Sequence, residues 1–299
     1  MNTSADTQST TDRTTKQRLR STVHAHPVAW FFVLAYAFSW IGWLPLVLGL
    51  EGPIRLVSFV AGGFGPAIAG AVVTWLDGES VRAWARQIIH WRVAPEWYLV
   101  VLVLPLLVVG AASVVIVLLG TDIDLSLLPG RLSLVLSSYV FVAAVGGGNE
   151  EPGWRGFALP RLQTQYAPVP ATLILGVVWA FWHLPQLVAD PSAVYGFAWL
   201  VEETPAIILR VVNIVGFAFL LTWVYNETES VLLALLLHAG INTVNSTLVP
   251  ISLEAITGES FMTVLIAVDV GVWLVAVLLI VVTRGQLGYR GTESPDGTD

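Results

Sequence analysis

Two adjacent acids and an arginine follow a long apolar run, in the stretch GGGNEEPGWRG at residues 146–156. On a helix, neighbouring side chains point about 100° apart, so Glu150 and Glu151 cannot face the same partner. Arg155 lies four residues after Glu151, which is the better spacing for an ion pair, and this leaves Glu150 free to face elsewhere. The alternative interpretation is a solvated acid pair at a helix end.

Only two of the five histidines fall inside apolar segments, His183 in VVWAFWHLP and His238 in LLLHAGINT. His238 and Asn242 are four residues apart, so they share one face of a helix. The alternative for His183 is a packed histidine bonded to a carbonyl. The alternative for His238 and Asn242 is a polar helix–helix contact.

Taken together, these side chains are the parts of a peptide-hydrolysing site. A glutamate and a histidine can hold and deprotonate a water molecule. A histidine and an asparagine can donate hydrogen bonds to a developing oxyanion. All of these residues fall within 150–242, and the glycine run at 146–148 permits close packing beside them.

The composition places this chemistry in a membrane. The 299 residues are 56% hydrophobic and 12% charged, whereas a soluble domain normally has about 25% charged residues. The chain has no cysteine, which excludes disulfides, iron–sulfur clusters and thiolate zinc sites. The net charge of −7 offers no basic patch for nucleic acid, and no P-loop or Rossmann fingerprint indicates a nucleotide.

The apolar runs predict an all-α, polytopic membrane protein with about eight transmembrane helices, since several runs reach the roughly 20 residues needed to cross a bilayer. The expected spans are residues 28–50, 55–76, 97–119, 132–149, 169–189, 203–225, 230–249 and 260–283. Between the second and third spans, segment 79–96 is too polar to cross, and its apolar residues at helical spacing predict a helix lying in the interface. We expect disordered tails at 1–26 and 285–299, which leaves 27–284 as the membrane-embedded domain.

The distribution of basic residues predicts that both termini are cytoplasmic. With eight spans, only Arg55 and Arg131 lie in outside loops. Inside segments hold eleven of the 14 basic residues: Arg13, Lys16, Arg18, Arg20, Arg82, Arg86, Arg92, Arg155, Arg161, Arg284 and Arg290. We therefore expect a multi-pass cell-membrane protein with the paired acids at the cytoplasmic end of the fourth span.

Three motifs in this order resemble the type II CAAX prenyl endopeptidases, also called the CPBP or abortive-infection family. They are EEPGWR at 150–155, WAFWH at 179–183 and HAGIN at 238–242, and they resemble E-E-x-x-x-R, F-x-x-x-H and H-x-x-x-N. Trp179 stands in the phenylalanine slot, which we interpret as a packing position. The motif core covers about 130–250.

This resemblance implies an eight-helix intramembrane endopeptidase that cleaves a membrane-associated protein or peptide, prenylated substrates among them. It implies that Glu150 is the general base and that His183 holds the water. His238 and Asn242 would stabilise the oxyanion, while Glu151 and Arg155 would fix the motif helix. For this mechanism we expect Glu150 within about 6 Å of His183.

Other interpretations stay open from the sequence. A divalent metal such as zinc could be held by Glu150, His183 and His238, but no H-E-x-x-H motif is present, and we favour direct catalysis by glutamate and histidine. A proton-coupled transporter would also carry intramembrane acids and histidines, and a non-catalytic immunity or scaffold protein could keep the same fold. Asp269, an intramembrane acid outside the motifs, is expected to be structural.

Overall fold

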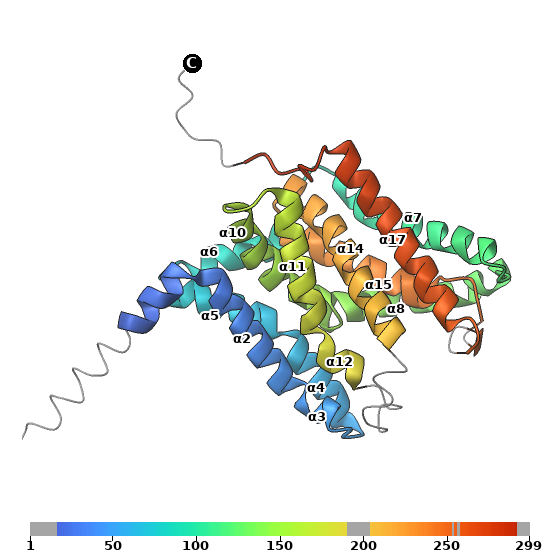
Figure 1. Ribbon diagram of the computed structural model, residues 1–299, viewed down its shortest axis with the longest axis horizontal. Coiled ribbons are helices and arrows are strands. Elements are labelled where there is room, and N and C mark those ends of the chain that lie inside the picture. Colours follow the sequence, from blue (N-terminus) through green and yellow to red (C-terminus); the bar gives the residue numbers. More distant parts are fainter. Residues whose placement is uncertain (1–16, 190–203, 253, 256–257, 292–299) are drawn as a thin grey trace, which may run out of the picture.

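The computed structural model describes residues 17–189, 204–252, 254–255 and 258–291, and these residues form helices and connecting turns with no strand. The predicted all-α class is therefore confirmed. Figure 1 shows the helices gathered into one bundle, with α2 to α5 at one side and α7, α8 and α17 at the other.

Helices occupy all eight ranges in which spans were predicted. They are α2 (Pro27–Gly42) with α3 (Leu44–Val47), α4 (Pro53–Gly63) with α5 (Gly65–Leu76), α7 (Glu96–Leu118), α8 (Leu128–Val145), α11 (Pro168–Trp182) with α12 (Leu184–Val188), α14 (Thr204–Thr228), α15 (Val231–Thr247) and α17 (Phe261–Val282).

A polytopic membrane protein is confirmed, whereas the number of spans stays a prediction. Among the described residues, five helical stretches are long and apolar enough to cross a membrane. A sixth is reached if Gln17–Ala25 and α2, which meet at a 105° bend, form one span. Helices α11 and α15 are apolar but shorter. The 15 residues of α11 extend only about 22 Å at 1.5 Å per residue.

The fourth predicted span ends too early at residue 149. Beyond α8 the chain continues through η3 (Gly148–Glu150), α9 (Glu151–Gly153), the π-helical turn η4 (Trp154–Ala158) and α10 (Leu159–Gln163). The sequence hides this continuation because its polar residues interrupt the apolar run. The residues that follow are nevertheless buried, with Trp154 and Phe157 fully inside the protein. The paired acids therefore lie in the middle of a broken helical run.

Parts of both segments expected to be disordered are ordered in the structure. Residues 17–25 form a helix, and Val23 within it is fully buried. After α17, the side chain of Leu287 is also fully buried, and its backbone carbonyl accepts a hydrogen bond from Asn226 Nδ2 at 3.0 Å. The polar composition of these segments concealed the single apolar residues that anchor them. Residues 1–16 and 292–299 lie outside the described part.

The polar segment between the second and third predicted spans is helical, as expected, at α6 (Val81–Arg86) and η1 (Gln87–Ile89). Its Gln87 side chain donates to the carbonyl of Gly156 at 3.3 Å and accepts from the Tyr225 hydroxyl at 3.1 Å. The run from η3 to α10, residues 148–163, contains the motif EEPGWR and is called the motif run below. The polar segment therefore contacts this motif run near Gly156. Its place in a membrane interface stays a prediction.

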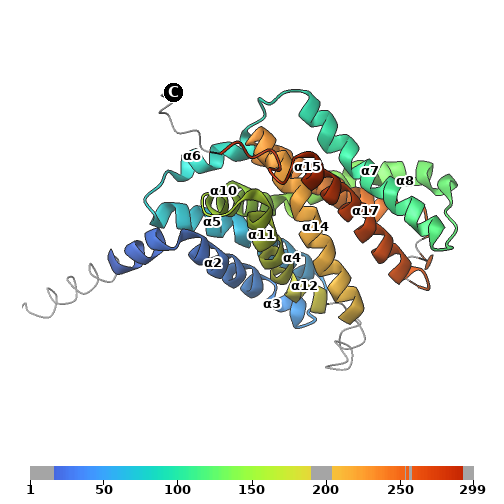
Figure 2. The ribbon, with the colours of Figure 1, turned by 45° about the horizontal axis from the view of Figure 1, so that its top comes forward.

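The helices pack as a series of neighbours: α2 on α5, α11 on α14, α14 on α17, α17 on α7, α7 on α15, and α15 on α8. Figure 2 shows α11 and α14 lying between the α2–α5 group and the α7–α17 group. The motif run packs on α5 through α9 and on α15 through η3.

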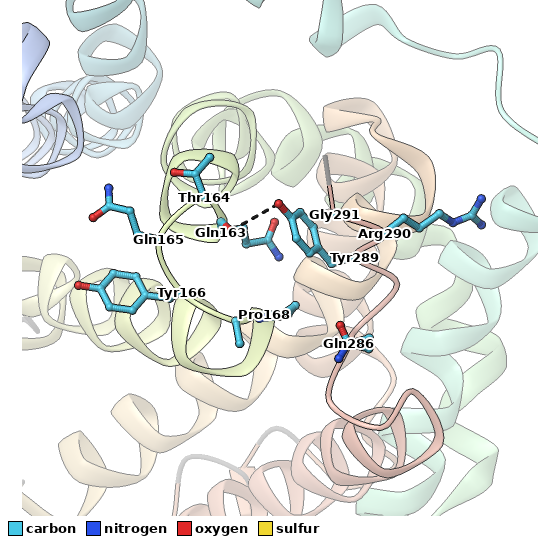
Figure 3. A pocket seen from close by; sticks show the side chains of 10 residues that line it. Gln163, Thr164, Gln165, Tyr166, Pro168, Gln286, Tyr289, Arg290 and Gly291 are labelled. Atoms are coloured by element: carbon cyan, nitrogen blue, oxygen red, sulfur yellow. Dashed lines mark hydrogen bonds between the residues drawn. The ribbon is translucent and has the colours of Figure 1, made fainter. Parts of the chain in front are cut away.

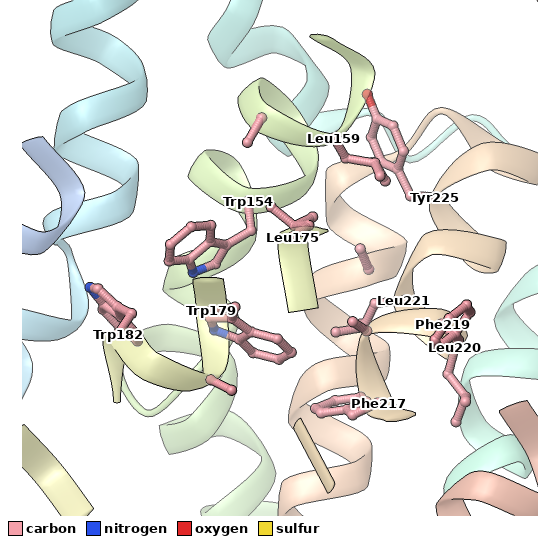
Figure 4. Close-up of a cluster of buried hydrophobic side chains, with 14 of the residues drawn as sticks. Trp154, Leu159, Leu175, Trp179, Trp182, Phe217, Phe219, Leu220, Leu221 and Tyr225 are labelled. Atoms are coloured by element: carbon pink, nitrogen blue, oxygen red, sulfur yellow. The ribbon is translucent and has the colours of Figure 1, made fainter. Parts of the chain in front are cut away.

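Large apolar side chains fill the space around the motif run. Figure 4 shows this cluster, with Trp154, Trp179 and Trp182 grouped on one side and side chains of α14 on the other. The ring of Trp154 lies 5.3 Å from that of Phe31 on α2 and 5.7 Å from that of Trp182. The motif run is thus held between rigid aromatic contacts from several helices.

Candidate active site

Three separate segments bring the predicted site residues together inside the protein. Glu150 and Glu151 come from η3 and α9, His183 from the end of α11, and His238 from the middle of α15. Glu150 is 5% exposed, Glu151 is fully buried and His238 is 2% exposed. Ionisable groups so deeply buried normally carry a function or a specific partner.

The Glu150 carboxylate faces the end of α11. Its Oε2 atom accepts a hydrogen bond from Trp179 Nε1 at 2.7 Å, and the same oxygen lies 4.0 Å from His183 Nε2. The separation falls within the 6 Å expected from the sequence.

A hydrogen bond at its Nδ1 atom sets the orientation of the His183 ring. His183 Nδ1 lies 2.9 Å from the backbone oxygen of Trp179. A carbonyl oxygen can only accept, so Nδ1 carries a proton and donates it. In the neutral ring, Nε2 is then an acceptor that faces Glu150.

The second acid, Glu151, has two partners. Arg155 Nη1 lies 3.2 Å from Glu151 Oε1 and 3.1 Å from Oε2, so the predicted ion pair is present. On its other side, Glu151 Oε1 lies 2.6 Å from His238 Nδ1. This contact, which sequence spacing could not reveal, joins the first motif to the third and fixes the ring of His238.

Gly147 marks the point where His238 and Asn242 converge. A Cβ atom built on Gly147 would lie 2.5 Å from His238 Nε2 and 3.1 Å from Asn242 Nδ2. The glycine has φ +147°, and its N–H donates to Asn149 Oδ1 at 3.0 Å. Two side-chain nitrogens therefore border the same small space, which any larger residue would fill. The glycine run was the sequence signal, but it did not single out this position.

A metal held by Glu150, His183 and His238 stays a prediction. Within the described residues, no group of three or more histidine, aspartate or glutamate side chains is arranged to hold a metal ion. His238 Nδ1 is engaged by Glu151, and His183 Nδ1 by a backbone carbonyl. Asp269 is 7% exposed on α17, outside the three motifs, and its structural role stays a prediction.

Two hollows lie near the motif segments. An apolar groove of about 530 Å³ is lined by side chains of α2 and α3 and by Leu184 and Pro185, which directly follow His183. A second hollow of about 480 Å³ lies where the α10–α11 turn meets the chain after α17. Figure 3 shows its polar lining, including Gln163 and Tyr289, and no motif residue lines it.

The fold and site define a polytopic helical membrane protein with a buried glutamate, two histidines and an asparagine gathered from three segments. Residues 132–244 match the family described as type II CAAX prenyl endopeptidase Rce1-like. A similar protein, CAAX prenyl protease 2 of Methanococcus maripaludis, is 27% identical over 104 residues, which cover 34% of this chain and 38% of that relative. Residues 132–244 are thus similar to the type II CAAX prenyl endopeptidases, the family that the three motifs resemble.

Proposed function

We propose that the protein is an intramembrane endopeptidase that hydrolyses a peptide bond in a membrane-associated protein or peptide. The observation that carries this proposal is the 4.0 Å separation between Glu150 Oε2 and His183 Nε2. If a water oxygen lies about 2.8 Å from both atoms, its two hydrogen bonds to them form an angle of about 90°, close to the H–O–H angle of water. Such a water donates one proton to each atom, and its lone pairs remain free to attack.

In the proposed reaction, Glu150 takes a proton from this water as the new C–O bond forms at the scissile carbonyl. His183 holds the water through Nε2. When the tetrahedral intermediate collapses, the C–N bond breaks and the proton passes from Glu150 to the leaving amine. In this proposed sequence, protein side chains and water carry every proton.

His238 and Asn242 are the proposed oxyanion donors. Their nitrogens Nε2 and Nδ2 converge beside Gly147. The contact of His238 Nδ1 with the Glu151 carboxylate fixes the ring, so that Nε2 borders the space beside Gly147. Preorganised donors of this kind stabilise charge that develops in the transition state.

The apolar groove lined by Leu184 and Pro185, which follow His183 in the chain, supports a membrane-associated substrate. It has room for part of a lipid chain, since pockets for small ligands span about 300–1,000 Å³. The family name supports a prenylated peptide as the first substrate to test.

The proposal is tested with a fluorogenic farnesylated CAAX peptide and purified protein in liposomes. We expect the wild type to cleave it, Glu150→Gln to abolish cleavage, and Glu96→Gln to cleave normally, because Glu96 is exposed at the start of α7. Cleavage by Glu150→Gln at the wild-type rate would contradict the assigned base. A folded but inactive wild type whose biological role tolerates Glu150→Gln would favour the scaffold, and substrate flux without cleavage would favour a transporter.

A further inference from the structure

Trp179 does more than fill the phenylalanine slot of the second motif. The side chain is 1% exposed. Its ring lies 5.5 Å from the ring of His238 and 5.6 Å from that of His183. It therefore stands between the two histidines of the site, where a phenylalanine could provide similar packing.

The indole nitrogen of Trp179 donates a hydrogen bond, which a phenylalanine cannot do. Trp179 Nε1 donates to Glu150 Oε2 at 2.7 Å, and this is the oxygen that faces His183 Nε2. Hydrogen bonds to an ionised acceptor are short and about twice as strong as neutral ones. A carboxylate oxygen with one bond from Trp179 keeps a lone pair for a water.

The indole is itself held in place from two sides. The Arg155 guanidinium carbon lies 4.5 Å from the centre of the Trp179 ring, within the range of a cation–π contact. The backbone carbonyl of Trp179 accepts from His183 Nδ1 at 2.9 Å. One residue thus contacts both members of the pair to which we assign the water, through its indole N–H and its backbone oxygen.

We propose that Trp179 is a positioning residue, whose indole N–H holds Oε2 of Glu150 toward His183. The inference rests on the proposed function, because it concerns the same water-activating pair. It assigns to this chain a contact that the phenylalanine of the family motif lacks. The carboxylate loses a fixed direction, but no reacting group, when the N–H is removed.

The test removes the N–H and leaves the ring. Trp179→Phe is compared with replacement of Trp179 by β-3-benzothienylalanine, in which sulfur takes the place of the indole N–H at nearly the same volume. Trp43→Phe is the matched control, because Trp43 is fully buried and its Nε1 donates to the carbonyl of Phe59 at 3.0 Å. Rates are measured on the farnesylated peptide over a range of concentrations.

We expect both changes at Trp179 to lower kcat about tenfold and to leave KM nearly unchanged. A tenfold loss of rate corresponds to an activation barrier raised by roughly 1.4 kcal/mol. Trp43→Phe is expected to lower thermal stability and to retain kcat. A second readout needs no catalysis: the indole ¹⁵N–H NMR signal that disappears in Trp179→Phe should move in Glu150→Gln and stay in place in Glu96→Gln.

The outcomes separate this inference from the proposed function. An active wild type, with Glu150→Gln inactive and the benzothienyl variant at full kcat, would overturn the role of Trp179 alone. An indole signal that does not respond to Glu150→Gln would also overturn it, since the contact would not exist in solution. A folded wild type without peptidase activity would overturn the proposed function and the positioning role with it.

Discussion

His238 Nδ1 lies 2.6 Å from Glu151 Oε1, although the two residues are 87 positions apart in the chain. Arg155 binds the same carboxylate, so arginine, glutamate and histidine form one buried row that ties α9 and η4 to α15. A buried charge is tolerated only with its partners, because desolvation penalises each charge that stands alone. The second acid of the motif therefore has a structural task that the first does not share.

Replacing Glu151 should cost far more stability than replacing Glu150. Glu151→Gln leaves the fully buried Arg155 without its anion, and breaking a buried pair in this way costs about 3–5 kcal/mol. Glu150→Gln keeps the Arg155–Glu151 pair intact. Thermal unfolding of both variants in detergent measures the difference, and equal unfolding temperatures would contradict the structural role of Glu151.

Gly147→Ala should abolish peptide cleavage and also lower thermal stability, because a φ of +147° strains any residue with a side chain. The new methyl group would lie 2.5 Å from His238 Nε2 and would occupy the space proposed for the oxyanion. Gly130→Ala is the control, because Gly130 lies in α8 with no atom within 4 Å of an added Cβ. Activity in Gly147→Ala at the level of Gly130→Ala would place the oxyanion elsewhere.

The sequence predicted the all-α class and named the residues that lie together in the candidate site, but it did not predict the contacts between them. Spacing of four residues predicted the Glu151–Arg155 pair, because it lies within one helix. The contact of Glu151 with His238 joins segments that are far apart in the chain, so the spacing of residues within one helix cannot predict it. The fourth span was predicted to stop at residue 149, whereas the helical stretch continues to Gln163, since hydropathy treats a buried ion pair as an exposed one.

Trp179 shows the same limit in a single residue. Its aromatic ring was correctly interpreted as packing, since the side chain is 1% exposed. The direction of its indole N–H depends on where Glu150 lies, and this is set by the π-helical and 3₁₀ turns around residues 148–158. Such irregular turns arise from tertiary contacts that no periodicity encodes.

Asn242→Ala should reduce kcat on the farnesylated peptide by about 10²–10³ and change KM little, as loss of one oxyanion donor does. Ser246→Ala, one turn further along α15, removes only a hydroxyl that bonds the backbone oxygen of Thr243 at 3.0 Å. The comparison of kcat and KM in the two variants is the measurement. A rise in KM at unchanged kcat would assign Asn242 to substrate binding instead.

Filling the apolar groove should weaken binding of a prenylated substrate without affecting the chemical step. Ala37→Phe places a ring in the groove next to Leu184 and Pro185, so KM for the farnesylated peptide is expected to rise severalfold. Val33→Phe, one turn earlier on α2 at a position that is 60% exposed, should leave KM unchanged. If both variants keep the wild-type KM, the lipid chain lies in another part of the protein.

Activity should survive removal of divalent metals. The donors of Glu150, His183 and His238 are not arranged as a ligand set, and the proposed water is held by protein atoms alone. Cleavage is measured after prolonged chelation, with the metal content of the same sample determined by mass spectrometry. Loss of activity that zinc restores would replace the proposed mechanism with a metal-dependent one.

The aromatic contact between Phe31 and the motif run has a consequence for exchanging parts between relatives. Phe31 stacks on Phe157 at 5.1 Å between ring centres, and Gly153 approaches the carbonyl of Pro66 so closely that an added Cβ would lie 2.3 Å away. Phe31 and Pro66 both lie outside residues 132–244, the region that matches the family. A chimera that transplants this region alone would therefore lose the contacts that α2 and α5 make with Phe157 and Gly153. Functional grafts should carry α2 and α5 with the region.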